Sequence, residues 1–333
     1  MIEEEILERL RCPGCGQPVR PSNEQLRCPS GHVIPFRDGY VDAMPDVRDV
    51  TTRRTLASFG YEWTTFDSIL PEDEEFWENY FADVPLGELE GRVALDAGCG
   101  KGRYALFTAP HVKSLAALDG SDAVRSAVRN LSIHPNVTVV KGDLRRAPFA
   151  AGSFDFVYCL GVLHHLDDPR AGFLEIVRLL SPGGLLLIYV YSRPENKGIR
   201  SMGLRSATLI RRLTVRMPLR LLRLVSRAIA PLLWLAFVIP GTLGDALRIR
   251  RLSRLPLGTY RRRPLRSLQL DTFDRLSAPC EARYVWPEIE PWFEQAGLTV
   301  ESVRESAGLF VVARRPGIGN DRARAPRSRA GEA

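Results

Sequence analysis

A short apolar run, a turn with three glycines and the start of a helix follow one another between residues 93 and 104. The run Val93–Asp96 reads as a buried strand, and the turn then places Gly98, Gly100 and Gly102 before the helix. Glycines at this spacing let the backbone approach a ligand closely and present N–H groups at a helix N-terminus. The feature therefore predicts an α/β domain that binds a ligand at the end of a strand.

Short apolar runs alternate with longer amphipathic stretches from about residue 91 to residue 192. Strands are expected at 92–96, 115–119, 137–140, 154–159 and 184–191, and helices at 104–110 and 171–180. This alternation implies a parallel sheet with helices on both faces. Further along, 286–296 reads as a helix, and 298–303 with 308–313 as a closing antiparallel pair.

Six segments are expected along the 333 residues. They are a cysteine-containing module (1–45), a helical lead-in (46–90), the α/β core (91–192), a basic and apolar helical insert (193–266), the C-terminal part of the α/β domain (267–316) and a disordered tail (317–333). An apolar fraction of 45% supports an ordinary packed core. The acidic start Met1-Ile-Glu-Glu-Glu is unlike a basic secretory leader, so a cytoplasmic location is expected.

Acidic residues end the first two expected strands of the core. Asp96 and Asp119 lie 23 positions apart, and an acid at the second place can accept hydrogen bonds from ribose hydroxyls. Taken alone, this spacing also suits a nicotinamide dinucleotide, and a glycine turn can be no more than a tight turn. The rest of the chain decides between these alternatives.

Four stretches resemble the motifs of one enzyme family, in the family's order. Val93–Tyr104 resembles motif I of class I S-adenosylmethionine-dependent methyltransferases, and Lys141-Gly-Asp-Leu144 resembles their third-strand acidic motif. Pro148-Phe with Ser153–Pro169 resembles the fourth-strand motif of the methyltransferase type 11 group, which includes ubiquinone and menaquinone methyltransferases. Leu179–Ile188 resembles the next motif. The likeness covers about 55–191 and, more loosely, 268–315.

This resemblance implies a Rossmann-like, seven-stranded, mostly parallel sheet and S-adenosylmethionine as the cofactor. It assigns Asp96 with Gly98, Gly100 and Gly102 to the amino-acid end of the cofactor, Asp119 to the ribose, Asp143 with Leu144 to the adenine edge, and Leu160 to the neighbourhood of the substrate. Asp143 has an alternative role as a helix cap. Cys99 is expected to be a small buried residue of the turn.

Methyl transfer from a sulfonium depends mainly on alignment and on the exclusion of water. For a hydroxyl, phenol or amine acceptor, a general base adds roughly 10²–10⁴-fold. His164 and His165 follow the fourth strand at the sheet edge where open α/β folds bind ligands, so each is a candidate base. The alternative is that they shape the pocket or cap a helix. Tyr61, Trp63 and Tyr191 are candidates for pocket walls or for the core.

The N-terminal module carries Cys12-Pro-Gly-Cys15 followed by Cys28-Pro-Ser-Gly-His32. Three thiolates and one imidazole at these spacings suit a tetrahedral structural zinc, with free cysteines or a disulfide as alternatives. The module resembles the zinc ribbon of rRNA guanine-N1 methyltransferases and the short zinc-binding domain that activates several methyltransferases. The first likeness implies RNA as a substrate, but the His164-His165 pair departs from that family.

The insert concentrates positive charge. Between Arg200 and Arg266 there are 16 arginines and a single acid, Asp245, which gives +15 against −8 for the remainder. Such a segment on an otherwise acidic chain favours an anionic partner. Pro218 can open a helix that places Arg220, Arg223 and Arg227 on one face.

An uncharged run of 17 residues, 228–244, follows these arginines. It falls short of the roughly 20 residues of a spanning helix, and Pro231, Pro240, Gly241 and Gly244 are expected to interrupt it. Three interpretations stay open: a peripheral membrane contact through 200–266, an apolar lid over a lipophilic substrate, or a helical subdomain or dimer contact.

The sequence thus favours methylation of a small, lipophilic or membrane-associated metabolite on O, C or N. RNA methylation, with the zinc ribbon as the recognition module, is the second hypothesis. A non-catalytic scaffold that binds the cofactor is the third.

Overall fold

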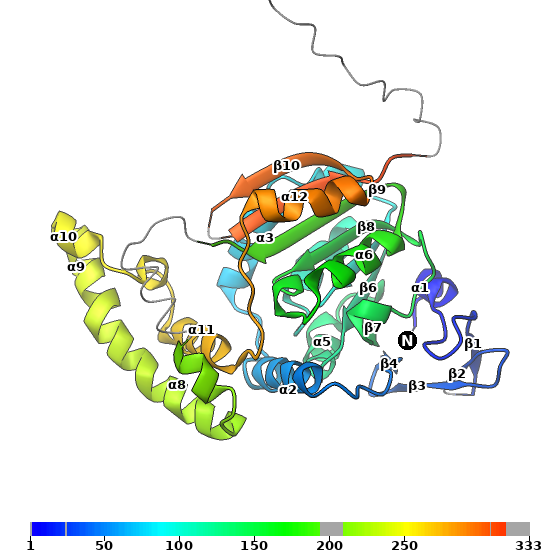
Figure 1. Ribbon diagram of the computed structural model, residues 1–333, viewed down its shortest axis with the longest axis horizontal. Helices are drawn as coiled ribbons and strands as arrows, with labels where there is room; N and C mark the ends of the chain where they lie inside the picture. Colours follow the sequence, from blue (N-terminus) through cyan, green and yellow to red (C-terminus); the bar gives the residue numbers. More distant parts are fainter. Residues whose placement is uncertain (1, 24, 194–208, 307, 318–333) are drawn as a thin grey trace, which may run out of the picture.

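The computed structural model describes residues 2–23, 25–193, 209–306 and 308–317. Its centre is an eleven-stranded sheet in the order β1-β2-β3-β4-β7-β6-β5-β8-β9-β11-β10 (Figure 1). Residues 194–208 of the insert, and the expected disordered tail apart from residue 317, lie outside the described ranges.

Seven of these strands form the α/β core. They are β5 (Val93–Ala97), β6 (Ser114–Asp119), β7 (Val137–Lys141), β8 (Phe154–Leu160), β9 (Leu180–Tyr191), β10 (Thr299–Glu305) and β11 (Gly308–Arg314). Strands β5 to β9 pair in parallel, whereas β11 lies antiparallel between β9 and β10. The prediction of a seven-stranded, mostly parallel Rossmann-like sheet is confirmed.

Helices cover both faces of this sheet. They are α1 (Glu4–Arg9), α3 (Pro71–Tyr80), α4 (Arg103–Thr108), α5 (Val124–Leu131), α6 (Pro169–Leu179) and α12 (Trp286–Gln295), with single 3₁₀ turns at Leu86–Glu88, Ala109–His111, Leu144–Arg146 and Leu163–His165. Helix α2 (Val50–Thr65) lies instead against α5 and α11. One buried cluster packs α1, α6 and α12 against one face, and a second packs α3, α4 and α5 against the other. Alternate residues of β5 enter the two clusters, as a strand covered on both sides requires.

The N-terminal module continues the main sheet. It contains β1 (Arg20–Ser22), β2 (Gln25–Arg27), β3 (Val33–Arg37) and β4 (Tyr40–Asp42). Strand β4 pairs in parallel with β7, and Ile6 and Leu10 are buried in the same cluster as α6. The module therefore shares its core with the α/β domain.

The insert is helical, as predicted, but its prolines do not interrupt it. A π-helical turn at Trp234–Val238 joins two α-helical segments, α8 (Leu219–Leu233) and α9 (Ile239–Ala246). Together they form one helix of 28 residues. The expectation of a broken run was wrong because α8 continues through Pro231, and the π turn that begins three residues later can absorb the local disruption of the hydrogen-bond ladder. By length and composition, with a mean hydropathy of 1.8, this helix could cross a membrane.

The rest of the insert folds back toward the domain. It contains α10 (Arg250–Ser253), a 3₁₀ turn at Gly258–Tyr260 and α11 (Leu265–Ser277). Gly244 permits a close approach of α10, since a Cβ there would lie 2.4 Å from the Cβ of Leu252. Figure 1 shows α8, α9 and α10 on the side of the sheet opposite the N-terminal module, with α11 between them and the core.

Candidate cofactor and acceptor cavity

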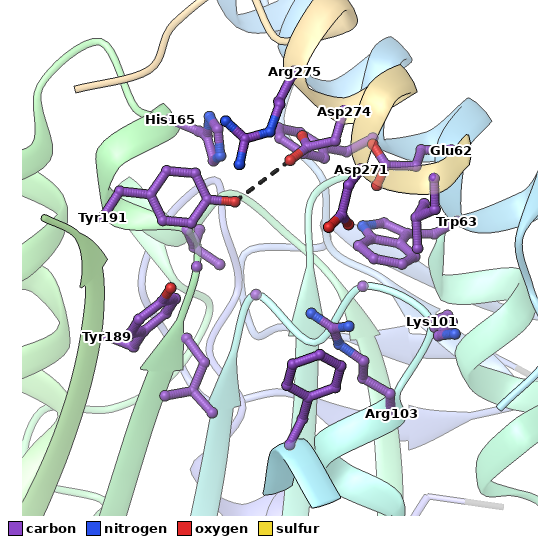
Figure 2. Close-up of a pocket in the computed structure, with 18 of the residues that line it drawn as sticks. Glu62, Trp63, Lys101, Arg103, His165, Tyr189, Tyr191, Asp271, Asp274 and Arg275 are labelled. Carbon is purple, nitrogen blue, oxygen red and sulfur yellow. Dashed lines mark hydrogen bonds between the residues drawn. The ribbon is translucent and has the colours of Figure 1, made fainter. Parts of the chain in front are cut away.

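A cavity of about 1190 Å³ lies at the carboxyl ends of the parallel strands. Its walls come from the glycine turn after β5, from the ends of β6, β8 and β9, and from α2, α3, α11 and the insert. This is the edge at which open α/β sheets bind ligands. Figure 2 shows the side chains that surround the central space.

The glycine turn forms the floor of the cavity. Gly98, Gly100 and Gly102 all have positive φ, at +98°, +54° and +82°. A Cβ on Gly98 would lie 2.3 Å from Cγ2 of Val162, and one on Gly100 would lie 3.2 Å from Nε1 of Trp63. Of the predicted turn residues, Gly98 and Gly100 line the cavity, whereas Gly102 caps α4 outside it.

Asp119 and Asp143 both line the cavity, as do the predicted Leu144 and Leu160. The carboxylate of Asp119 accepts hydrogen bonds from the backbone N–H of Gly100 at 2.9 Å and from the N–H and hydroxyl of Ser121 at 2.8 and 2.6 Å. It is thereby held against the glycine turn. Asp143 accepts from the N–H of Arg145 at 2.9 Å, so it also caps the 3₁₀ turn that follows it.

Asp96 lies behind the turn and does not line the cavity. Its side chain is 1% exposed, and Oδ2 has no partner among the described residues. Burial raises the pKa of this carboxyl well above its usual value. The position supports an indirect role, through the turn, and not the predicted direct contact with a ligand.

The two predicted histidines differ in position. His165 lines the cavity, and its Nδ1 lies 2.7 Å from the carbonyl oxygen of Cys280, so Nδ1 carries the hydrogen and Nε2 is left as an acceptor. His164 is fully buried, stacks on Tyr191 at 3.9 Å between ring centroids and does not line the cavity. Burial lowers its pKa well below the usual value. His164 is therefore a packing residue, as the alternative interpretation held, and the prediction that it is a candidate base is not supported by its position.

Sequence reasoning missed three carboxylates that surround the upper part of the cavity in Figure 2: Glu62 of α2, with Asp271 and Asp274 of α11. Glu62 is 1% exposed, and its Oε2 has no partner in the described chain. Burial and the neighbouring Asp274 and Asp271 raise the pKa of Glu62 well above its usual value. Its place between Tyr61 and Trp63 was the sole hint in the sequence.

Asp274 is the carboxylate nearest to the end of β9. The hydroxyl of Tyr191 donates to its Oδ2 at 3.4 Å, a long bond drawn in Figure 2, while Oδ1 is shielded from solvent with no described partner. Burial raises the pKa of Asp274 as well. Asp271, in contrast, accepts a hydrogen bond from the hydroxyl of Tyr260.

Aromatic side chains form part of the cavity wall. Trp63 lies over the glycine turn, with Nζ of Lys101 at 5.6 Å and Cζ of Arg103 at 5.2 Å from its ring centroid. Tyr191 also lines the cavity, whereas Tyr61 packs against Phe273 outside it.

Apolar residues of the insert complete the far wall. The lining includes Leu233 and Phe237 of the long helix, and Leu257 and Tyr260 near the 3₁₀ turn. The cavity thus has a polar end at Asp119 and an apolar end at Leu233, Phe237 and Leu257, and the basic Arg254 and Arg263 of the insert also line it.

The N-terminal Cys and His side chains converge at a second place. Ligand atoms of Cys12, Cys15, Cys28 and His32 all lie within 4.8 Å of one another. Cys15 Sγ is 3.5 Å from Cys28 Sγ, and Nδ1 of His32 is 3.4 Å from Cys12 Sγ and 3.5 Å from Cys28 Sγ. Tetrahedral zinc, with bonds of about 2.3 Å to sulfur and about 2.0 Å to nitrogen, requires separations of roughly 3.5–3.8 Å. The Cys₃His cluster fits that geometry.

Comparison with known proteins finds a family match that includes the glycine turn. Residues 95–188, which run from β5 to β9, match the family model of the methyltransferase domain. This segment is therefore similar to a methyltransferase domain. An uncharacterised chloroplast methyltransferase of Arabidopsis thaliana is 28% identical over 225 residues, which cover 56% of this chain and 62% of that protein. The sterol 24-C-methyltransferase of Schizosaccharomyces pombe is 29% identical over 163 residues, covering 46% of this chain and 42% of its own.

Among solved structures, an S-adenosylmethionine-dependent methyltransferase from Aquifex aeolicus is similar over 77% of this chain and 98% of its own, with 17% identity and a TM-score of 0.45. The chain spans about a quarter to three fifths of the length of the curated relatives it matches. The N-terminal module and the insert fall outside the residues that match the methyltransferase domain.

Replacement of Glu62 by Gln should stabilise the ligand-free protein increasingly as the pH rises. Because the pKa of Glu62 is raised in the folded state, its contribution to stability is complete at acid pH and is lost as the pH rises through that value. Calorimetric melting of wild type and Glu62→Gln between pH 5 and pH 9 measures the difference. Glu78→Gln, at an exposed position of α3, is the control. A gain that does not depend on pH would contradict the raised pKa.

Proposed function

We propose that this protein is an S-adenosylmethionine-dependent methyltransferase that acts on a small, lipophilic acceptor. The observation that carries the proposal is the single cavity between the glycine turn of the methyltransferase domain and the apolar wall of the insert. Its volume of about 1190 Å³ exceeds the roughly 300–1,000 Å³ of sites for one drug-sized ligand. This supports a site shared by a cofactor and an acceptor.

The polar end of the cavity suits the cofactor. Gly98 and Gly100 would let the backbone come close to its amino-acid end, Asp119 would accept hydrogen bonds from the ribose, and Asp143 with Leu144 would meet the adenine. When bound, S-adenosylmethionine supplies a methyl group on a sulfonium, which is already a good leaving group. The work left to the protein is alignment and the exclusion of water.

The apolar end suits an acceptor of low polarity. Tyr189 and Tyr191 from β9 line the cavity together with Leu233 and Phe237 from the insert. The likeness to a sterol 24-C-methyltransferase supports a lipophilic molecule, without specifying which one.

For an acceptor that loses a proton, Asp274 is the better-placed base. Asp274 lines the cavity, its Oδ2 accepts a hydrogen bond from the hydroxyl of Tyr191, and its Oδ1 has no partner among the described residues. His165, whose Nε2 is left as an acceptor, is the second candidate. An apolar wall and a carboxylate of raised pKa together suit removal of a proton from a hydroxyl, phenol or amine.

Labelled S-adenosylmethionine tests the function directly. The full chain is incubated with a host extract that has been divided into lipid, small-molecule and RNA fractions, and label should enter the lipid or small-molecule fraction. Asp119→Ala should abolish the transfer and weaken cofactor binding in calorimetry, whereas Asp122→Ala, outside the cavity, should do neither. Label in RNA alone would replace this proposal with RNA methylation guided by the N-terminal module. Absence of S-adenosylmethionine binding would refute the proposal that the protein is a methyltransferase.

The pH dependence of transfer tests Asp274. Because burial raises its pKa, the rate should rise with pH until Asp274 is ionised and then level off. Asp274→Asn should lower the rate by roughly 10²-fold or more and remove this rise while cofactor affinity is kept. The extract fraction that accepts label serves as substrate. His165→Asn is the comparison, and a loss confined to that variant would assign the base to His165.

We propose in addition that Cys12, Cys15, Cys28 and His32 hold a structural zinc ion. Their separations fit tetrahedral coordination, and four protein ligands leave no open position for a substrate. The pairing of β4 with β7 would transmit the stability of the site to the sheet.

Metal analysis should find one zinc ion per chain. Cys28→Ser should lose it, whereas Cys280→Ser, outside the cluster, should keep it. Chelation should unfold the two loops that carry the ligands, 12–15 and 28–32, seen as rapid amide hydrogen exchange there, because the ligands repel or separate without the ion. Cofactor affinity should change little, since none of the four ligands lines the cavity. A large loss of affinity would show that the module helps to build the cavity.

A further inference from the structure

One face of the long insert helix is apolar and exposed to solvent. Its large side chains, each between 40% and 65% exposed, are Leu221, Leu224, Leu232, Leu235, Ile239 and Leu243. Together with the exposed Ala228 they follow one another at steps of three or four residues, so they form a single stripe along the helix. Soluble proteins rarely expose a contiguous stripe of this kind without a partner for it.

The opposite face of the same helix is occupied. Leu222 packs with Phe273 and Leu276 of α11, and Ala230 packs with Leu268 and the ring of Tyr260. A helix that crosses a bilayer in isolation would have to give up these contacts, and 22% of its most apolar window is buried in them. The helix is therefore attached to the domain by one side and presents the other side outward.

Positive charge brackets the exposed stripe. Arg216, Arg220 and Arg227 are exposed toward its start, and Arg248, Arg250, Arg251 and Arg254 are exposed after its end. Between them, residues 228–244 carry no charge. The ion pairs of the insert in the described chain use other arginines: Arg193 with Glu288, Arg211 with Glu281 and Arg261 with Asp245. The bracketing arginines are thus available for anions outside the protein.

We propose that this face docks in the plane of an anionic lipid bilayer. The leucine stripe would enter the boundary between headgroups and acyl chains, and the bracketing arginines would contact lipid phosphates, each contributing to the attraction of a negative surface. The charge pattern favours this occupant over a second copy of the chain, because two such faces brought together would oppose arginine to arginine.

Docking would place the cavity next to the membrane. Leu233 and Phe237 line the cavity from the same helix whose Leu232 and Leu235 would enter the lipid. A lipophilic acceptor would then reach the apolar end of the cavity without crossing water. This consequence rests on the proposed function, whereas the docking itself does not.

Flotation of the full chain with vesicles tests the docking. Wild type should float with phosphatidylcholine vesicles that contain phosphatidylglycerol, and less with phosphatidylcholine alone. The double variant Leu232→Gln/Leu235→Gln should lower the membrane partition coefficient at least about tenfold for both kinds of vesicle. The reason is that two leucine side chains no longer enter the lipid. Ile133→Gln/Leu174→Gln, which removes exposed apolar residues of the α/β domain, should bind as wild type does.

The arginines are tested separately. Arg220→Gln/Arg227→Gln should weaken binding to the anionic vesicles alone, and the difference from wild type should vanish in about 1 M salt, where the screening length is about 3 Å. Unchanged circular dichroism and melting temperature in each variant would exclude unfolding as the cause. Vesicle binding that survives in a protein without methyl transfer would separate this proposal from the proposed function.

Four results would overturn the docking. The first is that wild type does not float with anionic vesicles at low salt. The second is that the leucine variant binds vesicles as strongly as wild type does. Retention of the protein in membranes after alkaline carbonate extraction would point to a spanning helix instead. A dimer in sedimentation, converted to monomer by the leucine variant while vesicle binding is absent, would assign the face to a second copy.

Discussion

Two backbone hydrogen bonds hold the site on which everything else in this protein depends. The N–H groups of Gly98 and Cys99 donate to the carbonyl oxygen of Leu118 at 2.8 and 2.9 Å, so the turn after β5 is fastened to the end of β6. Asp119 then reaches back to the N–H of Gly100. With β8 paired on the other side of β5, these bonds fix a backbone floor against which a ligand can be aligned.

Above this floor, the protein places groups that favour function over stability. Glu62 and Asp274 are carboxylates taken from water without full hydrogen bonding, and each has a raised pKa for that reason. Such groups are tolerated because the surrounding helices α2 and α11 are held by apolar contacts. The same α11 anchors the long insert helix, so the roof of the cavity and the exposed leucine stripe are parts of one packed unit.

Much of the fold followed from local patterns. Continuous apolar runs located β5 to β9 within a few residues, because strands buried on both faces have little polar sequence. Gly98, Gly100, Asp119 and Asp143 meet in one cavity, as their places at the ends of parallel strands predicted. The insert was misjudged at Pro231, since whether a proline ends a helix depends on a π turn that propensity does not reveal.

The sequence by itself determined the order of strands and helices, the glycine turn and the Cys₃His set, since each is written in residues close together along the chain. The tertiary structure alone decided which acids meet. Glu62 lies more than two hundred positions from Asp274, and their shared burial arises from the packing of α2 on α11. It also decided that Asp96 and His164 sit behind the cavity and that β4 joins β7. Contacts between distant segments depend on packing, which no local pattern encodes.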